Sequence, residues 1–258
     1  MHHAYIDKFA YQDSLIHRLD SRVKFIVVLI FTTVVISLPT ASPAILTCYA
    51  IGPFAVLVLA KIPLKFAFRQ ILLVSPFVLV LALSCPLYDK TSVNVAFGPF
   101  FWQTSLGWLR CFVIIGKFIV TMLALIALVS TTRFADLLAG LQRLFLPKLL
   151  IIQLGFLYRY IFVLIDQAQH ILRARTARRL RSLGFKKELR IAGAMLGSLL
   201  TRSIDKAEHI NIAMQARGFD RNFRTLSRLE IRRCDYIFVL LAVSFILALH
   251  FFVNPVLR

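Results

Sequence analysis

The chain has 258 residues, of which 59% are apolar and only 17% are charged, and its mean hydropathy is +0.77. Soluble domains average about 45–50% apolar and about 25% charged residues, so this composition is typical of a protein in contact with lipid. The charges are unequal, with 31 Lys and Arg against 12 Asp and Glu. In a soluble chain this balance would indicate nucleic-acid binding, but in an apolar chain it indicates membrane orientation. Four widely spaced cysteines predict no disulfide framework. A soluble enzyme and a small secreted scaffold are both excluded.

Apolar segments along the chain approach the roughly 20 residues that a helix needs to cross a bilayer. Residues 23–60 form one apolar run, which Pro39 and Pro43 divide because proline removes a backbone donor and ends a helix. The sequence therefore predicts an all-α polytopic membrane protein with five transmembrane helices, or six if residues 149–165 also enter the bilayer. The three spans after the first two are expected at 71–87, 106–129 and 236–253.

Basic residues in short loops predict the orientation of these spans. Lys8, Arg18, Arg22 and Lys24 lie before or at the start of the first span, whereas the turn at 39–43 has no Lys or Arg. We therefore expect a cytoplasmic N-terminus. A basic segment before an apolar one also resembles a secretory signal, but no small-x-small cleavage site follows it, so we expect no cleavage.

This orientation divides the chain into four parts. A cytoplasmic segment that follows the fourth span holds 20 of the 31 basic residues and 7 of the 12 acidic residues. The charge excess of the protein is therefore concentrated on one side of the membrane. The predicted parts are an N-terminal cytoplasmic segment (1–22), four transmembrane helices (23–130), cytoplasmic helices (131–234) and a C-terminal transmembrane helix (235–258).

The cytoplasmic segment shows the three-and-four spacing of apolar residues that indicates amphipathic helices. A short helix is predicted at 134–146, before Pro147. A long helix is predicted at 148–183, ended by Gly184, and the next at 188–217, ended by Gly218.

Each long helix carries an arginine close to its C-terminal end, on the same face as its apolar stripe. The stripe of the first helix comprises Leu164, Ala168, Ile171 and Arg175, and that of the second comprises Leu196, Leu200, Ser203, Ala207, Ile210 and Met214. Arg178 follows Ala177, and Arg217 lies between Ala216 and Gly218. A cation near a helix C-terminus is favoured by the helix dipole, by about 0.3–1 kcal/mol. A guanidinium beside a small residue can also project into a partner's pocket and bind a carboxylate with two parallel hydrogen bonds. The first interpretation explains one such arginine well, whereas the repeated context favours docking. Spacing alone leaves both open.

Two basic residues lie within the fourth span. Arg110 is near its outer end, where a long side chain can extend to the membrane surface. Lys117 is close to mid-span, and intramembrane cations normally face protein or water. We expect Lys117 to contact either a partner subunit or a carbonyl inside the helical bundle.

The predicted outer loop at 94–102 is rich in aromatic residues. Aromatic side chains gather at membrane–water interfaces, where an amphipathic ring suits both media. We expect a hairpin at the membrane interface, with a partner-docking surface as the alternative.

Several stretches of the chain resemble one family. Residues 200–208 (Leu-Thr-Arg-Ser-Ile-Asp-Lys-Ala-Glu) and 213–219 (Ala-Met-Gln-Ala-Arg-Gly-Phe) resemble the signature of the transmembrane T subunit of energy-coupling factor transporters. The resemblance is to the CbiQ type, found in cobalt and nickel importers. Residues 14–24, 158–168 and 174–179 resemble the family's N-terminal segment, the start of its first coupling helix and its first Ala-Arg motif. The paired Ala-Arg motifs are the most specific part.

The chain departs from the family pattern at three places. Arg179 stands where a glycine or another small residue is expected, and Gln167 stands where a glutamate is expected. Arg133 and Phe134 replace the expected proline after a pair of threonines. These departures leave both docking arginines in place and affect only where the helices end.

The resemblance implies a non-catalytic coupling subunit in the bacterial plasma (inner) membrane. Long cytoplasmic helices of such a subunit cross and bind two CbiO-like ABC ATPases, one at each Ala-Arg motif. Its membrane face binds a CbiM-like substrate-binding S subunit, with a small CbiN-like subunit as an optional partner. ATP and Mg²⁺ are then bound by the ATPases and cobalt or nickel by the S subunit, so no cofactor is expected in this chain. The matching residues here are Ala177, Arg178, Arg179, Ala216, Arg217 and Gly218.

Other classes of protein agree less well with the residues. A secondary transporter or channel needs intramembrane acidic groups and often an inverted repeat, and the predicted spans contain no Asp or Glu. A membrane-bound enzyme would bring carboxylates or histidines together, and the six histidines lack metal-ligand spacing. The apolar faces of the basic helices favour protein contacts over nucleic acid. No Gly-x-x-x-x-Gly-Lys phosphate loop occurs. A T subunit of a vitamin importer remains an alternative.

Overall fold

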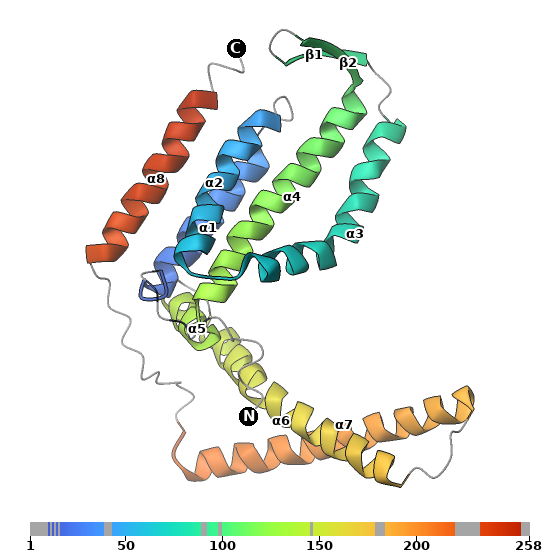
Figure 1. The fold of residues 1–258 in the computed structure, drawn as a ribbon. Helices are drawn as coiled ribbons and strands as arrows, with labels where there is room; N and C mark the ends of the chain where they lie inside the picture. The colour runs from blue at the N-terminus through green and yellow to red at the C-terminus, as the bar shows by residue number, and fades with distance from the viewer. Residues whose placement is uncertain are drawn as a thin grey trace. The chain divides into compact units, whose positions relative to one another are not determined.

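The computed structural model describes residues 10, 12, 14, 16–38, 43–88, 92–97, 100–144, 147–178, 184–219 and 233–253. Within these ranges the chain is almost entirely helical and has one two-stranded hairpin (Figure 1). The helices are α1 (Ser21–Ser37), α2 (Pro43–Leu59), α3 (Leu64–Tyr88), α4 (Leu106–Thr131), α5 (Phe134–Arg143), α6 (Lys148–Ala177), α7 (Phe185–Ala216) and α8 (Arg233–Val253). The strands are β1 (Ser92–Phe97) and β2 (Phe100–Ser105).

The chain divides into two compact units. The bundle unit comprises Ile6–Gly140 and Leu229–Arg258 and contains α1 to α4, most of α5, and α8. The arm unit comprises Met1–Tyr5 and Leu141–Arg228 and contains α6 and α7. The boundary falls inside α5, so the arm unit continues directly from the end of this short helix.

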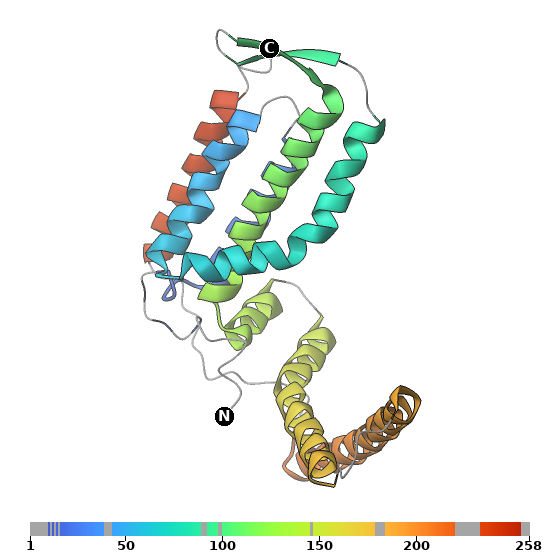
Figure 2. The same ribbon diagram turned by 45° about the vertical axis from the view of Figure 1, so that its right-hand side comes forward.

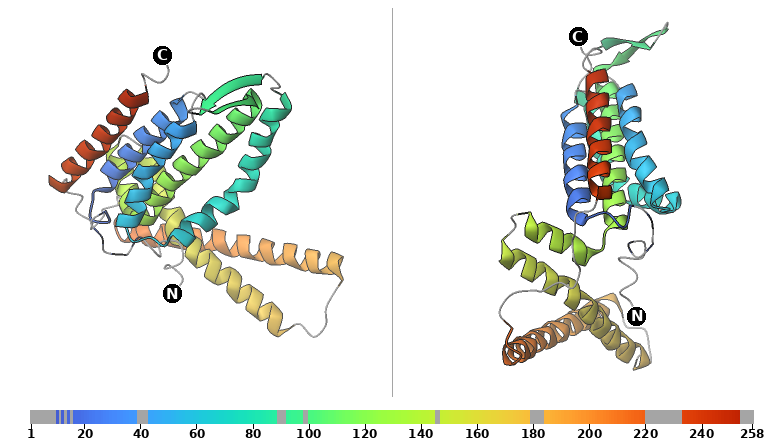
Figure 3. Two further views of the ribbon diagram at one scale, coloured as in Figure 1. Left: turned by 45° about the horizontal axis from the view of Figure 1, so that its top comes forward. Right: turned by 90° about the vertical axis from the view of Figure 1, so that its left-hand side faces the viewer.

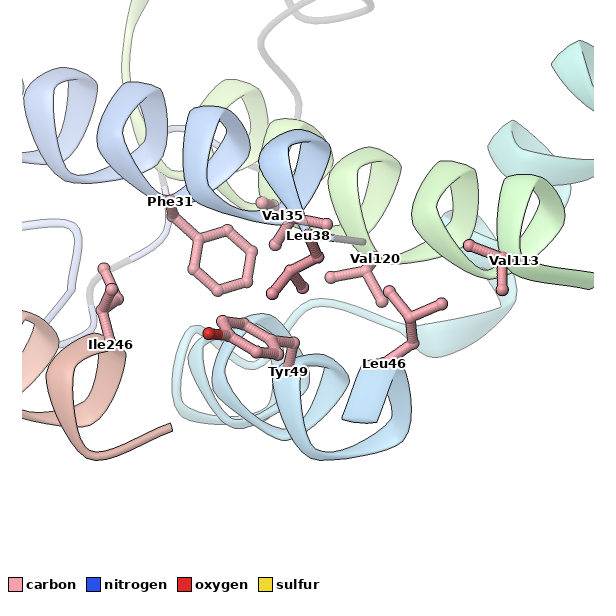
Figure 4. Close-up of a cluster of buried hydrophobic side chains, with 9 residues drawn as sticks. Phe31, Val35, Leu38, Leu46, Tyr49, Val113, Val120 and Ile246 are labelled. Carbon is pink, nitrogen blue, oxygen red and sulfur yellow. The ribbon is translucent and has the colours of Figure 1, made fainter. Parts of the chain in front are cut away.

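In the bundle unit, α4 lies at the centre and packs against α1, α2 and α3, while α8 packs against α1 and α2 (Figure 2). The main core cluster combines residues of α1, α2, α4 and α8, and Figure 4 shows the ring of Tyr49 facing Phe31 within it. Gly116 lets α4 approach Leu46 of α2, because a Cβ there would lie 3.0 Å from a Leu46 methyl carbon. Small residues allow such close helix contacts in membranes. The cluster consists of Phe31, Val35, Leu38, Leu46, Tyr49, Val113, Val120, Ala124 and Ile246.

The outer faces of the bundle helices are apolar and exposed. On α3, Phe77 has 78% of its surface exposed and Val80 has 75%. A soluble protein rarely exposes contiguous apolar surface on this scale, whereas a protein in lipid does so without penalty. The surface therefore agrees with the composition, and the chain is a membrane protein with several apolar helical spans.

Each of the five predicted spans corresponds to a helix, but length and apolar composition support them unequally. Among the described residues, three helical segments are long and apolar enough to cross a membrane: Leu64–Leu87, Leu106–Thr131 and Lys148–Ala177. The shorter helix Leu46–Leu59 is also apolar. The third of these segments contains the optional sixth span at 149–165. How many helices cross the bilayer stays a prediction.

The prediction for α3 was wrong at its beginning, since the helix starts at Leu64 and not near residue 71. The helix is visibly bent in Figure 2. Pro76 lies inside it, and an internal proline removes one backbone hydrogen bond and kinks a helix. The early residues of α3 are amphipathic enough to look like a loop in sequence, because Lys65 and Arg69 interrupt the apolar pattern.

The segment before α4 is a hairpin in an otherwise helical set of described residues. Strands β1 and β2 form an antiparallel pair in which Phe97 is opposite Phe100 and Ser92 is opposite Ser105. This pairing confirms the hairpin expected at 94–102. Strand β2 leads without a break into α4.

In the arm unit, α6 and α7 are long helices that contact and cross each other (Figure 3). The aromatic ring of Phe219, just after α7, lies 6.4 Å from that of Phe156 on α6. Three predicted boundaries were wrong: the end of α6, the start of α7, which is Phe185 and not residue 188, and the end of α5. Helix α6 ends at Ala177 and not at residue 183, and Gly184 is the N-cap of α7 and not the C-cap of α6. Helix α5 ends at Arg143, short of residue 146.

Candidate functional site: the ends of the two long helices

The two arginines of the Ala-Arg motifs occupy the same position in their helices. Arg178 is the C-cap residue of α6, with φ −93° and ψ −1°, and Arg217 is the C-cap residue of α7, with φ −89° and ψ 8°. The backbone N–H of Arg178 donates to the carbonyls of Arg175 and Thr176, and that of Arg217 donates to those of Met214 and Gln215. The two motifs therefore match in backbone conformation as well as in sequence.

The end of α7 is closed by glycine, as the sequence predicts. Gly218 has φ +71°, a conformation that glycine adopts without steric cost. The N–H of Phe219 donates to the Met214 carbonyl at 3.1 Å, and the N–H of Gly218 donates to the Gln215 carbonyl at 3.0 Å. This pair of bonds is the Schellman arrangement, which satisfies carbonyls that the helix leaves without partners. The position of Arg217 is thus determined by a well-defined helix end.

The residues of both motifs are exposed where the structure describes them. Ala177, Arg178, Ala216, Arg217 and Gly218 are all exposed, and Arg179 lies outside the described residues. Exposed guanidinium groups at two helix ends are free to bind acidic groups of other proteins, and a dipole effect alone does not require this exposure. Their docking role stays a prediction.

The apolar stripes that lead to these arginines differ between the two helices. On α6, the predicted stripe is half-buried throughout, and Arg178 is the first exposed member. On α7, Ser203, Ile210 and Met214 are half-buried, but Ala207 is exposed, and Leu196 and Leu200 are more than 60% exposed. The contact face of α7 is therefore rotated slightly from the predicted one in the first half of the helix. The half-buried residues of the α6 stripe are Leu164, Ala168, Ile171 and Arg175.

An ion pair joins the two helices near the first motif. The Arg175 guanidinium, in the last turn of α6, donates to the carboxylate of Glu188, in the first turn of α7. Each charge also has the sign that its helix end favours. Sequence reasoning placed Arg175 on the apolar stripe and missed Glu188. An opposite charge 13 positions later, across a predicted helix–helix turn, was the available signal.

An open pocket of about 430 Å³ lies between α6 and α7. Gln167 contributes from α6, and Arg202, Lys206 and His209 contribute from α7, together with Asp205. Two permanent cations against one carboxylate favour an acidic group as a neighbour. Asp205 and His209, four residues apart on the surface of α7, are both exposed.

No group of three His, Cys, Asp or Glu side chains within the parts of the chain that the structure describes is arranged to hold a metal ion. The adjacent His2 and His3, which the sequence allows either as ligands of a transition metal or as plain surface residues, lie outside the described residues.

The intramembrane lysine contacts the end of a neighbouring helix. The Lys117 ammonium donates to the carbonyl of Ile36 at 2.9 Å and to that of Leu38 at 2.5 Å. Both carbonyls belong to the C-terminal end of α1, where backbone oxygens have no partner within the helix. This is the second of the two arrangements that the sequence allowed for Lys117. Arg110 is exposed on α4, and contact of either residue with an S subunit stays a prediction.

Replacing Lys117 should destabilise the bundle unit. Lys117→Leu leaves the carbonyls of Ile36 and Leu38 unsatisfied, which should lower the free energy of unfolding by about 1–3 kcal/mol. Lys117→Arg keeps a cationic donor and should lower the free energy of unfolding by less. Unfolding in a detergent titration measures this effect. If Lys117→Leu leaves this free energy unchanged but no longer binds an S subunit, the lysine acts at a subunit contact instead.

The fold and these helix ends together define a class: an apolar helical membrane subunit that continues into a pair of long crossed helices with exposed arginine ends. A family model described as cobalt transport protein, CbiQ, matches residues 12–227. The chain therefore belongs to the CbiQ family of membrane transport proteins.

Individual relatives agree with this assignment. The chain is 30% identical to the energy-coupling factor transporter transmembrane protein EcfT of Bacillus selenitireducens over 83% of each chain. It is 34% identical to the cobalt transport protein CbiQ of Rhodobacter capsulatus, over 39% of this chain and 41% of the relative. It is 38% identical to the nickel permease LarQ of Lactiplantibacillus plantarum, over 36% of this chain and 33% of the relative.

Proposed function

We propose that the chain is the non-catalytic T subunit of an energy-coupling factor importer, and that it transmits ATP-driven motion of two ABC ATPases to a separate S subunit. The observation that carries the proposal is the pair of exposed C-cap arginines, Arg178 and Arg217, in matching backbone conformations. Two equivalent helix ends suit two equivalent or similar ATPase subunits. Membership in the CbiQ family supports the same function.

The proposed mechanism follows from the stiffness of α6 and α7 and from the attachment of their terminal arginines to the ATPases. ATP and Mg²⁺ are bound by the partner ATPases, which change their separation during the ATP cycle. Each guanidinium, held at a fixed helix end, binds a carboxylate on one ATPase and follows its movement. Because α6 and α7 contact each other and are joined by the Arg175–Glu188 ion pair, displacement of one end is passed to the other helix.

The proposed cargo is cobalt or nickel, held by the S subunit rather than by this chain. Relatives that match parts of the chain are named for each metal, which supports the metal branch over a vitamin importer. The corresponding S subunit would be CbiM-like, with a CbiN-like accessory subunit. A stand-alone secondary transporter is the alternative, and it requires substrate uptake without any ATPase.

Co-expression with candidate ATPase and S subunits encoded beside this chain tests the proposal. Affinity purification through a tag on this chain should recover two ATPase copies and one S subunit. Cells that express the complete set should then accumulate radioactive cobalt or nickel in an ATP-dependent manner. A chain that purifies folded but alone, or that supports uptake without the ATPases, would contradict the proposed function.

A further inference from the structure

Four helix ends of the bundle unit meet at one buried polar cluster, which we name the junction. It brings together the N-terminal ends of α1, α5 and α8 and the C-terminal end of α4. These residues are far apart in the sequence, and sequence reasoning used the charged ones only as topology signals or not at all. The junction consists of Asp20, Ser21, Lys24, Thr131, Asp136 and Asp235.

Lys24 binds the end of α4. Its side chain is 4% exposed, and its ammonium donates to the carbonyl of Thr131, the last residue of α4, at 3.0 Å. A second bond, at 3.4 Å, goes to the carbonyl of His17. The carbonyls at a helix C-terminus lack hydrogen-bond partners within the helix and carry partial negative charge. A lysine ammonium supplies both a donor and a positive charge.

Asp235 ties α8 to the start of α1. This residue lies in the first turn of α8 and is 2% exposed. Its Oδ1 accepts a hydrogen bond from the backbone N–H of Asp20 at 2.9 Å. Asp20 is itself the N-cap of α1, because its Oδ1 accepts from the N–H of Arg22 at 2.9 Å. The Asp235 carboxylate therefore anchors α8 to the start of α1, and the Asp20 carboxylate caps α1.

Ser21 binds the start of α5. Its hydroxyl donates to the Asp136 carbonyl at 2.7 Å. Gly140 of the same short helix packs so closely that a Cβ there would lie 2.8 Å from the Ser21 hydroxyl oxygen and 3.4 Å from the Arg22 backbone nitrogen. Thus α1 holds α4 on one side of the short α4–α5 connection and α5 on the other.

The charges of the junction match the helix ends that carry them. Asp20, Asp136 and Asp235 lie at helix N-termini, where negative charge is favoured, and Lys24 lies against a C-terminus, where positive charge is favoured. The Lys24 ammonium also attracts all three carboxylates. Hydrogen bonds are electrostatically stronger in a buried, low-dielectric site than in water, and the Oδ2 atom of Asp20 is buried there without a hydrogen-bond partner. Such a cluster resists relative movement of the four ends.

We propose that the junction transmits movement of α5 to α1 and α8, with Lys24 as its central positioning residue. The proposal rests on the coupling function above and adds the route by which motion enters the bundle unit. Along the chain, α5 runs from the bundle unit into the arm unit. A displacement of α5 would reach α4 through the backbone. Ser21, Lys24 and Asp235 add direct polar links from the first turns of α1 to α5, α4 and α8.

Hydrogen–deuterium exchange on the complete complex, with and without a non-hydrolysable ATP analogue, tests this route. In the wild-type complex, the nucleotide should change exchange at the ends of α6 and α7 and in the first turns of α1 and α8. Lys24→Met should reduce the response of α1 and α8 at least tenfold, while the response of α6 and α7 stays within twofold. Lys24→Arg should preserve both. A purely structural role would change both regions together.

Each junction variant has a control variant with the same substitution at a residue outside the junction. Lys65→Met removes an exposed lysine from α3 and should leave every response unchanged. If Lys24→Met fails to fold, Ser21→Ala takes its place in the test, because it removes one junction hydrogen bond and retains all charges. The nucleotide response of α1 and α8 in Ser21→Ala should fall about threefold. Its control is Ser75→Ala, because the Ser75 hydroxyl bonds only within α3, to Leu72.

The outcomes separate the two proposals. A full nucleotide response of α1 and α8 in Lys24→Met, or in Ser21→Ala where the first variant fails to fold, overturns the junction proposal alone. A wild-type chain that binds no ATPase overturns the coupling function, and the junction proposal falls with it.

Discussion

The double variant Arg178→Ala/Arg217→Ala is expected to retain no ATPase on affinity purification, and each single variant is expected to retain one copy. An interface arginine that binds a carboxylate with both nitrogens typically contributes about 2–4 kcal/mol. This corresponds to a loss of affinity of roughly 30-fold to 1,000-fold at each site. Both arginines are exposed, so their removal should leave the fold of the arm unit unchanged. Quantification of ATPase copies per chain measures the effect.

Two further double variants show whether ATPase binding depends on the geometry of the guanidinium groups or only on their charge. Arg173→Ala/Arg190→Ala removes the same charge from exposed positions inside α6 and α7 rather than at their C-caps, and should retain both ATPases. Lysine at positions 178 and 217 keeps the charge but loses the planar fork, so binding should be intermediate. If alanine at either position costs less than about 1 kcal/mol of binding, the helix-dipole interpretation is correct and the docking interpretation is wrong.

Asp235→Ala should lower the free energy of unfolding of the bundle unit by about 3 kcal/mol. The change leaves the buried N–H of Asp20 without its acceptor and removes one carboxylate that attracts Lys24. Loss of one member of a buried charged cluster is costly because the remaining groups stay desolvated. Unfolding in a detergent titration, followed by circular dichroism, measures the difference.

Asp235→Asn separates the hydrogen bond from the charge. The amide retains an oxygen that accepts from Asp20, so it should recover about half of the loss. Asp205→Ala is the control, since Asp205 is exposed on α7 and should change this free energy by less than about 0.5 kcal/mol. Equal stability of Asp235→Ala and the wild-type chain would show that the Asp235–Asp20 bond contributes nothing.

Local signals in the sequence predicted the helix ends that matter for docking. Gly218 directly follows an arginine and a long amphipathic pattern, and it closes α7 with a positive φ as expected. The same reasoning failed at Gly184, which begins α7 instead of ending α6. Glycine is compatible with both ends of a helix, and only the contacts of the neighbouring residues decide between them.

The polar partners of the buried charges could not be predicted in the same way. Lys24 and Lys117 stand out in sequence as cations in apolar segments, but their partners are backbone carbonyls 107 and 79 to 81 positions away. Every residue has a carbonyl, so the sequence contains no signal for which one is used. Asp235 likewise accepts from a backbone N–H 215 positions away. Almost every residue has such a group, so this partner also has no signal in the sequence.

The sequence by itself determined that this is a helical membrane protein of the CbiQ type, with its basic charge gathered around two long helices that each carry an Ala-Arg motif. These properties depend on composition and on spacing within one helix, where neighbours are known in advance. Only the tertiary structure decided that Lys117 closes the end of α1, that Glu188 pairs with Arg175, and that four helix ends meet around Lys24. Those contacts depend on packing between distant segments, which brings together groups that no local pattern relates.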